Sequence, residues 1–187
     1  MQATGSASLS TEVEYERLVA ILRRTGKEFK IAKEAINFES LKSMITMKPK
    51  IIHISCHGDY DKEAGEYYLQ FEGLGDGLSD KFSESRLKGL LGGGDHGIQL
   101  AFVSACHSEK IGKIFGECGI PIVIYVNQYS KIADEICLIF SRQLYSHLLV
   151  GAPVQRAFDD TRRVVAAAGK NCKSCCCAHD HTPDCPW

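Results

Sequence analysis

Three short and almost continuous apolar runs, separated by segments with helical spacing, constrain the fold of this chain most strongly. The runs cover residues 51–55, 98–103 and 120–126 and are rich in isoleucine and valine. Such runs are typical of buried strands, and even the longest is too short to cross a bilayer. Strands that alternate with helices predict an α/β domain, with a mostly parallel sheet and helices on both of its faces.

The other elements follow from the same patterns. Helices are predicted over residues 11–24, 38–47, 83–91, 107–118, 132–149 and 153–168; strands over 66–71 and, more briefly, 29–32; and a charged loop over 59–65. We expect a flexible N-terminus over residues 1–10, one domain over 11–168, and a tail rich in cysteine and histidine over 169–187.

Composition narrows the classes of function. The chain has 22 Lys and Arg against 23 Asp and Glu, so no overall charge favours nucleic acid or an acidic membrane. The N-terminal residues lack a basic stretch followed by an apolar one, which predicts no secretory signal and a cytoplasmic protein. Five of the nine cysteines crowd the last 16 residues, which favours metal binding or reactive thiols over a framework of disulfides.

Two polar segments lie at the carboxyl ends of predicted strands, where open α/β sheets place their sites. His57 and Gly58 follow the strand at 51–55, and Cys106 follows the strand at 98–103, 49 positions after His57. A cysteine thiolate is a nucleophile, and a nearby imidazole can take its proton or protonate a leaving amine. The pattern predicts a Cys–His dyad, with Cys106 as nucleophile and His57 as acid and base.

The same segments predict groups that stabilise a negative oxygen in the transition state. Gly58 has no side chain, so its backbone N–H can approach a substrate carbonyl closely, and the N–H of Cys106 supplies a second donor. We also expect Cys106 to lie directly before a helix that begins at residue 107, whose dipole favours the thiolate.

Four segments in this order resemble the CHAT domain: HISCHG at 53–58, VSAC at 103–106, GIP at 119–121, and a helical segment at 134–162 that begins with acidic residues and ends in arginine. This family of caspase-like cysteine peptidases is related to separases, and the resemblance covers residues 28–168. The resemblance implies a caspase-like three-layer sandwich that is shortened at its N-terminal part. It also implies a cysteine endopeptidase that hydrolyses peptide bonds in a protein or peptide substrate without a cofactor. It also assigns catalysis to His57 and Cys106, and implies a partner of the TPR type or another sensor module that gates activity.

The residues around the dyad have plainer interpretations. His53 is expected to be structural, Cys56 to face away from His57 and pack, and Cys118 and Cys137 to belong to the core. The acidic residues after His57, chiefly Asp59 and Asp61, either receive a basic side chain of the substrate or form a solvated loop. The caspase pattern Gln-Ala-Cys-x-Gly is absent, so specificity for aspartate is not expected.

The tail supplies a different chemistry. Cys172 and Cys175 have the spacing of a zinc knuckle, and His179 or His181 with Cys185 would complete a tetrahedral site in the 172–185 segment. An acylated or oxidation-prone cysteine cluster, or a linker to a further domain, are alternatives. The sequence therefore also allows a catalytically silent CHAT-like scaffold or signalling module with a zinc-binding tail.

Overall fold

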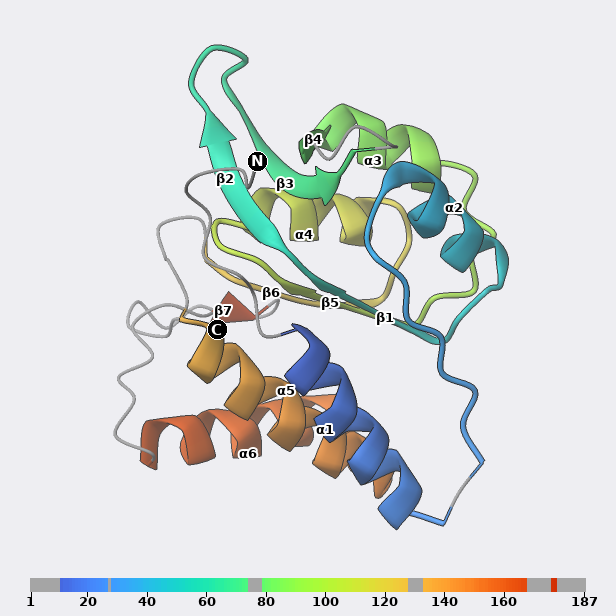
Figure 1. Cartoon of the computed structure of the whole chain (residues 1–187), viewed down its shortest axis with the longest axis vertical. Coiled ribbons are helices and arrows are strands. Elements are labelled where there is room, and N and C mark those ends of the chain that lie inside the picture. The colour runs from blue at the N-terminus through green and yellow to red at the C-terminus, as the bar shows by residue number, and fades with distance from the viewer. Residues whose placement is uncertain (1–10, 27, 74–78, 128–132, 168–175, 178–187) are drawn as a thin grey trace. The chain divides into compact units, whose positions relative to one another are not determined.

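The computed structural model describes residues 11–26, 28–73, 79–127, 133–167 and 176–177. Within these residues the chain forms an α/β structure of six helices and seven strands, divided into two compact units (Figure 1). The first unit contains α2 (Phe38–Thr46), β1 (Ile51–Ser55), β2 (His57–Asp61), β3 (Glu66–Glu72), β4 (Ser79–Ser83), α3 (Glu84–Leu91), β5 (Leu100–Ser104), α4 (Glu109–Glu117), β6 (Ile122–Tyr125) and β7 (Cys176–Cys177). The second contains α1 (Thr11–Arg24), α5 (Asp134–Leu149) and α6 (Val154–Ala167).

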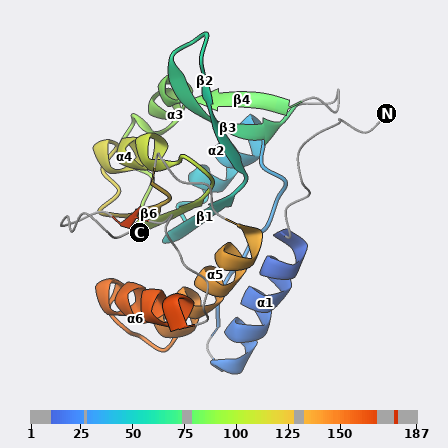
Figure 2. The ribbon, with the colours of Figure 1, turned by 90° about the vertical axis from the view of Figure 1, so that its left-hand side faces the viewer.

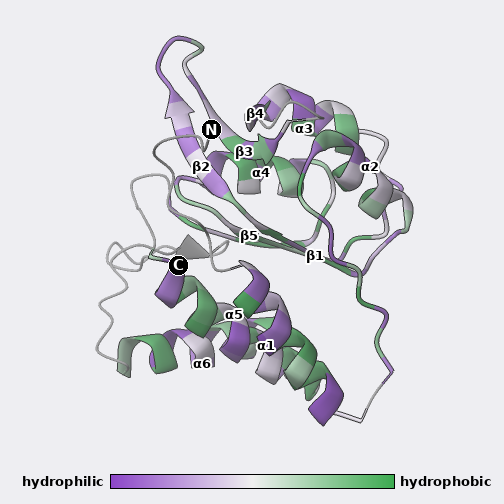
Figure 3. Ribbon diagram, viewed as in Figure 1, coloured by the Kyte–Doolittle hydropathy of each residue, from purple (hydrophilic) through white to green (hydrophobic). Residues whose placement is uncertain are grey.

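The three apolar runs form the parallel part of one sheet. Its strand order is β1-β5-β6-β7; β1, β5 and β6 are parallel, and the short β7 pairs antiparallel with β6. All five residues of β5 are buried, as expected for a central strand, and Figure 3 shows β1 and β5 in the green of apolar residues. Because the three strands are parallel, Ser55, Ser104 and Tyr125 end their strands at the same edge of the sheet.

A second sheet of three antiparallel strands has the order β2-β3-β4. The prediction of one mostly parallel sheet was therefore incomplete. The loop expected at residues 59–65 was partly wrong as well, because β2 extends to Asp61, and β4 was not predicted at all. Both strands consist mostly of polar residues and neither contains an apolar run, so no apolar pattern predicts them. Each is held in its sheet by pairing with β3.

The core of the first unit lies between these sheets and the helices. Helix α4 contacts β3, β5 and β6, and α3 contacts α4, β3 and β4. The cluster includes Ile54 and Val103 from the parallel sheet, Phe115 from α4, and the stacked rings of Phe71 and Phe82, whose centroids are 4.4 Å apart. Helices thus cover part of both sheets within this unit.

The helix α2 illustrates how local sequence sets an element boundary. Asn37 accepts a hydrogen bond from the backbone N–H of Ser40, and the Ser40 hydroxyl accepts one from the backbone N–H of Asn37, which forms a capping box. The strand expected just before it, at residues 29–32, is wrong: residues 28–37 form no helix or strand, and Phe29 and Ile31 are each 43% exposed. An apolar pair cannot form a strand without a neighbouring ladder.

The second unit is a packed group of helices. Helix α5 contacts both α1 and α6 and lies between them in Figure 2. Phe140 of α5 meets Phe158 of α6 edge to face at 5.8 Å. Burial, with a smaller contribution from the buried Glu14 of α1, raises the pKa of Tyr145 on α5. The predicted helices at 11–24, 132–149 and 153–168 are confirmed over the residues described.

Candidate active site

Where β1 ends, the backbone passes from one sheet to the other. The N–H of Cys56 still donates to the carbonyl of Ser104 in the parallel sheet, at 3.4 Å. One residue later, His57 begins β2 and pairs with Gln70 of β3. A single residue therefore separates the two ladders, and this switch sets His57 at the carboxyl edge of the parallel sheet.

The switch brings Gly58 against the residue that follows β5. A Cβ atom placed on Gly58 would lie 2.1 Å from the carbonyl oxygen of Cys106 and 3.4 Å from the Cβ of Ala105. A real Cβ cannot come within 3.0 Å of such an atom, so this backbone contact requires glycine. The His57–Gly58 segment and Cys106, far apart in the sequence, are therefore neighbours in the structure.

The turn that carries Cys106 is held by Ser108. Its buried hydroxyl donates to the carbonyl of Val103 at 3.2 Å and accepts from the N–H of Val126 at 2.9 Å. One side chain thus joins the turn to the ends of β5 and β6. The helix expected at residue 107 instead begins at Glu109, so Cys106 lies two residues before the N-cap position of α4.

His107 has a backbone conformation that is unusual for a residue with a side chain. Its φ is +55°, in the left-handed region. This geometry turns the chain sharply between β5 and α4, and the imidazole of His107 lies 6.5 Å from the ring of Tyr67, centroid to centroid. Non-glycine residues in this region occur disproportionately at functional turns.

The two cysteines of this region have contrasting environments. Cys56 is 6% exposed, and burial, with a smaller contribution from Cys106, raises the pKa of its thiol to about 12. Cys106 is only partly buried. The packing role expected for Cys56 is confirmed, and its thiol stays protonated and unreactive at neutral pH.

His53 also has a structural environment. It pairs with Phe102 across β1 and β5, and their rings stack at 4.5 Å with an interplanar angle of 17°. Cys118 is half-buried against the core, and Cys137 is half-buried on α5. Both were expected in the core, and neither is fully buried there.

The acidic residues after His57 differ from one another. Asp61 accepts hydrogen bonds from the N–H groups of Glu63 and Ala64 and pairs with Lys81 at 2.5 Å. The hydrogen bond from Lys81 is the main cause that lowers the pKa of Asp61. Asp59 is exposed on the same strand. Of the two, Asp61 is engaged in the hairpin turn, whereas Asp59 faces solvent.

The sequence did not point to two residues of this region, namely Ser108 and Tyr67. Ser108 acts through hydrogen bonds to β5 and β6, and Val126 lies 18 residues further along the chain, so no local pattern reveals it. Tyr67 was placed correctly in a strand, but its contact with His107 depends on how the sheets are arranged.

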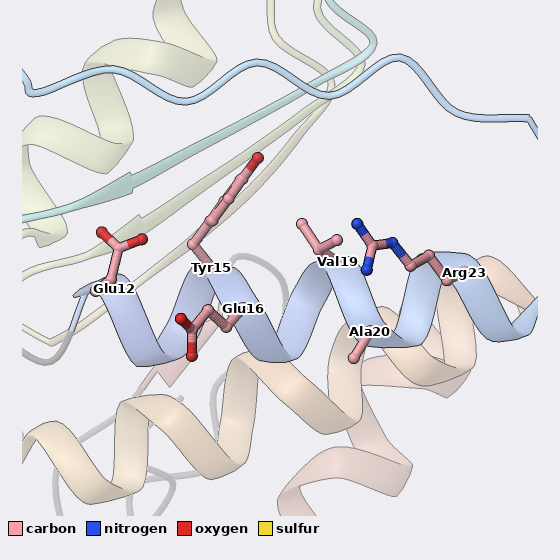
Figure 4. Close-up of a pocket in the computed structure, with 6 residues that line it drawn as sticks. All are labelled: Glu12, Tyr15, Glu16, Val19, Ala20 and Arg23. Carbon is pink, nitrogen blue, oxygen red and sulfur yellow. The ribbon is translucent and has the colours of Figure 1, made fainter.

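A surface pocket lies elsewhere, along α1. It is lined by Glu12, Tyr15, Glu16, Val19, Ala20 and Arg23, and Tyr15, Val19 and Arg23 project from one side of the helix (Figure 4). All six residues come from one helix and none is a cysteine or histidine, so the pocket has no nucleophile or general base of the expected kind.

The zinc ligands expected in the tail lie outside the described residues. Cys172, Cys175, His179, His181 and Cys185 are all in this category. Within the part of the chain that the structure describes, three or more His, Cys, Asp or Glu side chains nowhere gather in a metal-binding arrangement.

Comparison with known protein families gives a match over most of the sequence. The family model of the CHAT domain matches residues 2–184, which is nearly the whole chain. No curated protein matches the sequence. Of the helices described, none combines the length and the apolar character that crossing a membrane requires.

Proposed function

The chain belongs to the CHAT domain family, and on this basis we propose that it is a cysteine endopeptidase in which Cys106 and His57 form the catalytic dyad. The observation that carries the proposal is the contact of the Gly58 backbone with the carbonyl of Cys106. This contact brings the residue after His57 against the candidate nucleophile. We also propose that the fold is the caspase-like three-layer sandwich.

The reaction has two covalent steps. His57 takes the proton of the Cys106 thiol, and the thiolate attacks the scissile carbonyl carbon. The C–N bond breaks as His57 returns the proton to the leaving amine, which leaves a thioester on Cys106. Water then attacks the thioester with His57 as base, releasing the acid and restoring the thiol.

The backbone supplies the stabilisation of the tetrahedral intermediates. The N–H groups of Gly58 and Cys106 donate to the developing oxyanion, and each such donor typically contributes about 10²- to 10³-fold to the rate. Ser108 acts as a positioning residue, since it ties the turn of Cys106 to β5 and β6.

Further parts of the proposal concern substrate and control. Exposed Asp59 is the acidic residue available to a basic side chain of a protein substrate, because Asp61 is paired with Lys81. A sensor partner of the TPR type that gates activity, a cytoplasmic location, and a structural zinc in the 172–185 tail remain predictions.

The test is the rate at which a small alkylating reagent labels each cysteine across pH, with the sites assigned by mass spectrometry. We expect Cys106 to react far faster than Cys118 near neutral pH, and His57→Ala to remove this advantage. His147→Ala, on α5 in the other unit, is the matched control and should leave it intact. If Cys106 reacts no faster than Cys118, or if its rate is unaffected in His57→Ala, the chain is a scaffold rather than a peptidase.

A further inference from the structure

Three rings form a row that starts beside Cys106. The centroids of His107 and Tyr67 are 6.5 Å apart, and those of Tyr67 and Tyr60 are 4.8 Å apart. At the far end, the hydroxyl of Tyr60 lies 3.9 Å from where Gly65 would carry a Cβ, in the turn between β2 and β3. The row therefore leads from the residue next to the nucleophile to the tip of the hairpin.

Strand alternation places this row on one face of the hairpin. Tyr60 and Tyr67 are directly opposite each other, and they share a face with Leu69, two residues further along β3. Leu69 is 1% exposed and belongs to the core, whereas Tyr60 is 42% exposed. The aromatic face of the hairpin, which packs into the core at Leu69, therefore extends to Tyr60 and Tyr67, and at Tyr60 it is exposed to solvent.

The backbone of His107 supports a functional reason for this arrangement. Among the described residues, only His107 and Lys48 combine a side chain with a positive φ. Lys48 lies in the turn before β1 and pairs with Asp95. At His107 the strained turn directs the imidazole toward Tyr67, directly after the candidate nucleophile.

The charges of the hairpin strands lie on the opposite face. Asp59, Asp61 and Glu66 alternate with Tyr60 and Tyr67, and Asp61 is directly opposite Glu66 in the ladder. No strand residue on the aromatic face between Gly58 and the hairpin turn carries a charge. Such a surface favours an uncharged side chain, because the strand residues of this face offer a charged one no ion pair in return for its lost water.

We propose that His107, Tyr67 and Tyr60 form a specificity subsite that takes an aromatic or aliphatic side chain of the peptide substrate, close to the scissile bond. The inference rests on the proposed function of Cys106 and deepens it by naming a substrate class. The bound side chain packs against the tyrosine rings, and its position relative to Cys106 is set by the turn at His107.

The experiment is the cleavage of a peptide library derived from a digested proteome, with the cleaved bonds identified by mass spectrometry. It compares the wild-type chain with Cys106→Ala, Tyr60→Ser, Tyr67→Ser and Tyr68→Ser. Tyr68 is the matched control, since it is a tyrosine of the same strand on the opposite face. Tyr60→Ser guards against a folding defect in Tyr67→Ser, because Tyr60 is the most exposed of the three tyrosines that are changed.

We expect cleavage that depends on Cys106, with aromatic or aliphatic residues enriched within a few positions of the cleaved bond. In Tyr60→Ser and Tyr67→Ser, kcat/KM for such peptides should fall by roughly 3- to 10-fold relative to other peptides, and Tyr68→Ser should keep the preference. Cleavage without this preference, or a preference that survives in both tyrosine variants, overturns the subsite and leaves the peptidase intact. Absence of any cleavage that depends on Cys106 overturns the proposed function itself, and the subsite with it.

Discussion

Gly58 and Cys106 are in backbone contact: a Cβ on Gly58 would lie 2.1 Å from the carbonyl oxygen of Cys106. Nothing in the backbone angle of Gly58 demands glycine, since its φ lies outside the left-handed region. The requirement is one of space. It exists because β1 and β5 run in parallel and the chain changes sheets at Cys56, directly beside the end of β5.

Gly58→Ala should therefore disable the site. The new methyl group must displace the backbone of Cys106, and overpacking of this kind typically costs about 1–3 kcal/mol of unfolding free energy. We expect alkylation of Cys106 to slow to the rate seen in His57→Ala, together with a lower midpoint in urea.

The control is Gly89→Ala in α3, where a Cβ would meet no atom within 4 Å. This change should raise stability by roughly 0.5–1 kcal/mol, because alanine favours a helix interior over glycine, and should leave Cys106 labelling unchanged. Wild-type reactivity of Cys106 in Gly58→Ala would contradict the assignment of this contact to the site.

Ser108→Ala should loosen the turn that carries Cys106. The change leaves the N–H of Val126 without its hydroxyl acceptor, and a buried donor without a partner costs about 1–3 kcal/mol. We expect urea unfolding to show this loss in the free energy of unfolding, and Cys106 to be labelled more slowly. The pH dependence of labelling should not change, because the ionising groups are not altered.

Ser146→Ala provides the comparison. Its hydroxyl donates to the carbonyl of Arg142 within α5, and the loss should stay within about 0.5 kcal/mol. Equal stability losses in the two variants would show that Ser108 makes no special contribution to the turn.

The two cysteines near the site should differ in their response to pH. Burial raises the pKa of Cys56 to about 12 from 9.0, so the folded state holds the neutral thiol. The resulting stabilisation is complete below pH 9 and is lost as the pH rises toward 12, because only the unfolded state releases the proton in that window.

Urea unfolding at pH 8 and pH 10.5 measures this effect. We expect the free energy of unfolding to fall more between these pH values in the wild type than in Cys56→Ala, and native Cys56 to resist alkylation at pH 8. Rapid labelling of Cys56 in the folded protein, or identical pH dependence of the two proteins, would argue against a buried neutral thiol.

The elements that sequence predicted well are those whose burial is continuous. The strand at 51–55 is confirmed to the residue. The strands at 98–103 and 120–126 contain β5 apart from Ser104 and all of β6, because short apolar runs with β-branched residues are typical of buried strands. The polar strands β2 and β4 were not predicted, since their stability comes from pairing with β3. Pairing depends on two segments of the chain, so the residue pattern of one segment alone does not reveal it.

The same distinction applies to the candidate site. The contact between Gly58 and Cys106 agrees with a general rule, that parallel strands bring their carboxyl ends to one edge. The roles of Ser108 and Tyr67 did not follow, because each depends on a contact with a residue far away in the sequence. The left-handed turn at His107 also escaped prediction, since residues other than glycine rarely adopt it.

His107→Gly separates the strain of the turn from the function of the ring. Glycine adopts a positive φ freely, whereas a residue with a side chain pays about 1–2 kcal/mol there. The loss of the ring contact with Tyr67 offsets part of this gain, so we expect stability within about 1 kcal/mol of the wild type.

The preference for aromatic and aliphatic substrate residues should nevertheless weaken in His107→Gly, because the row loses the ring nearest to Cys106. Lys48→Gly removes the side chain at another described position with a positive φ, far along the chain from Cys106, and should leave the preference unchanged. Peptide-library cleavage and urea unfolding of both variants provide the measurement. A wild-type preference in His107→Gly, together with a large gain in stability, would mean that His107 is merely a strained turn residue. A weakened preference at nearly constant stability would mean that the strain is retained because it orients the ring toward the substrate.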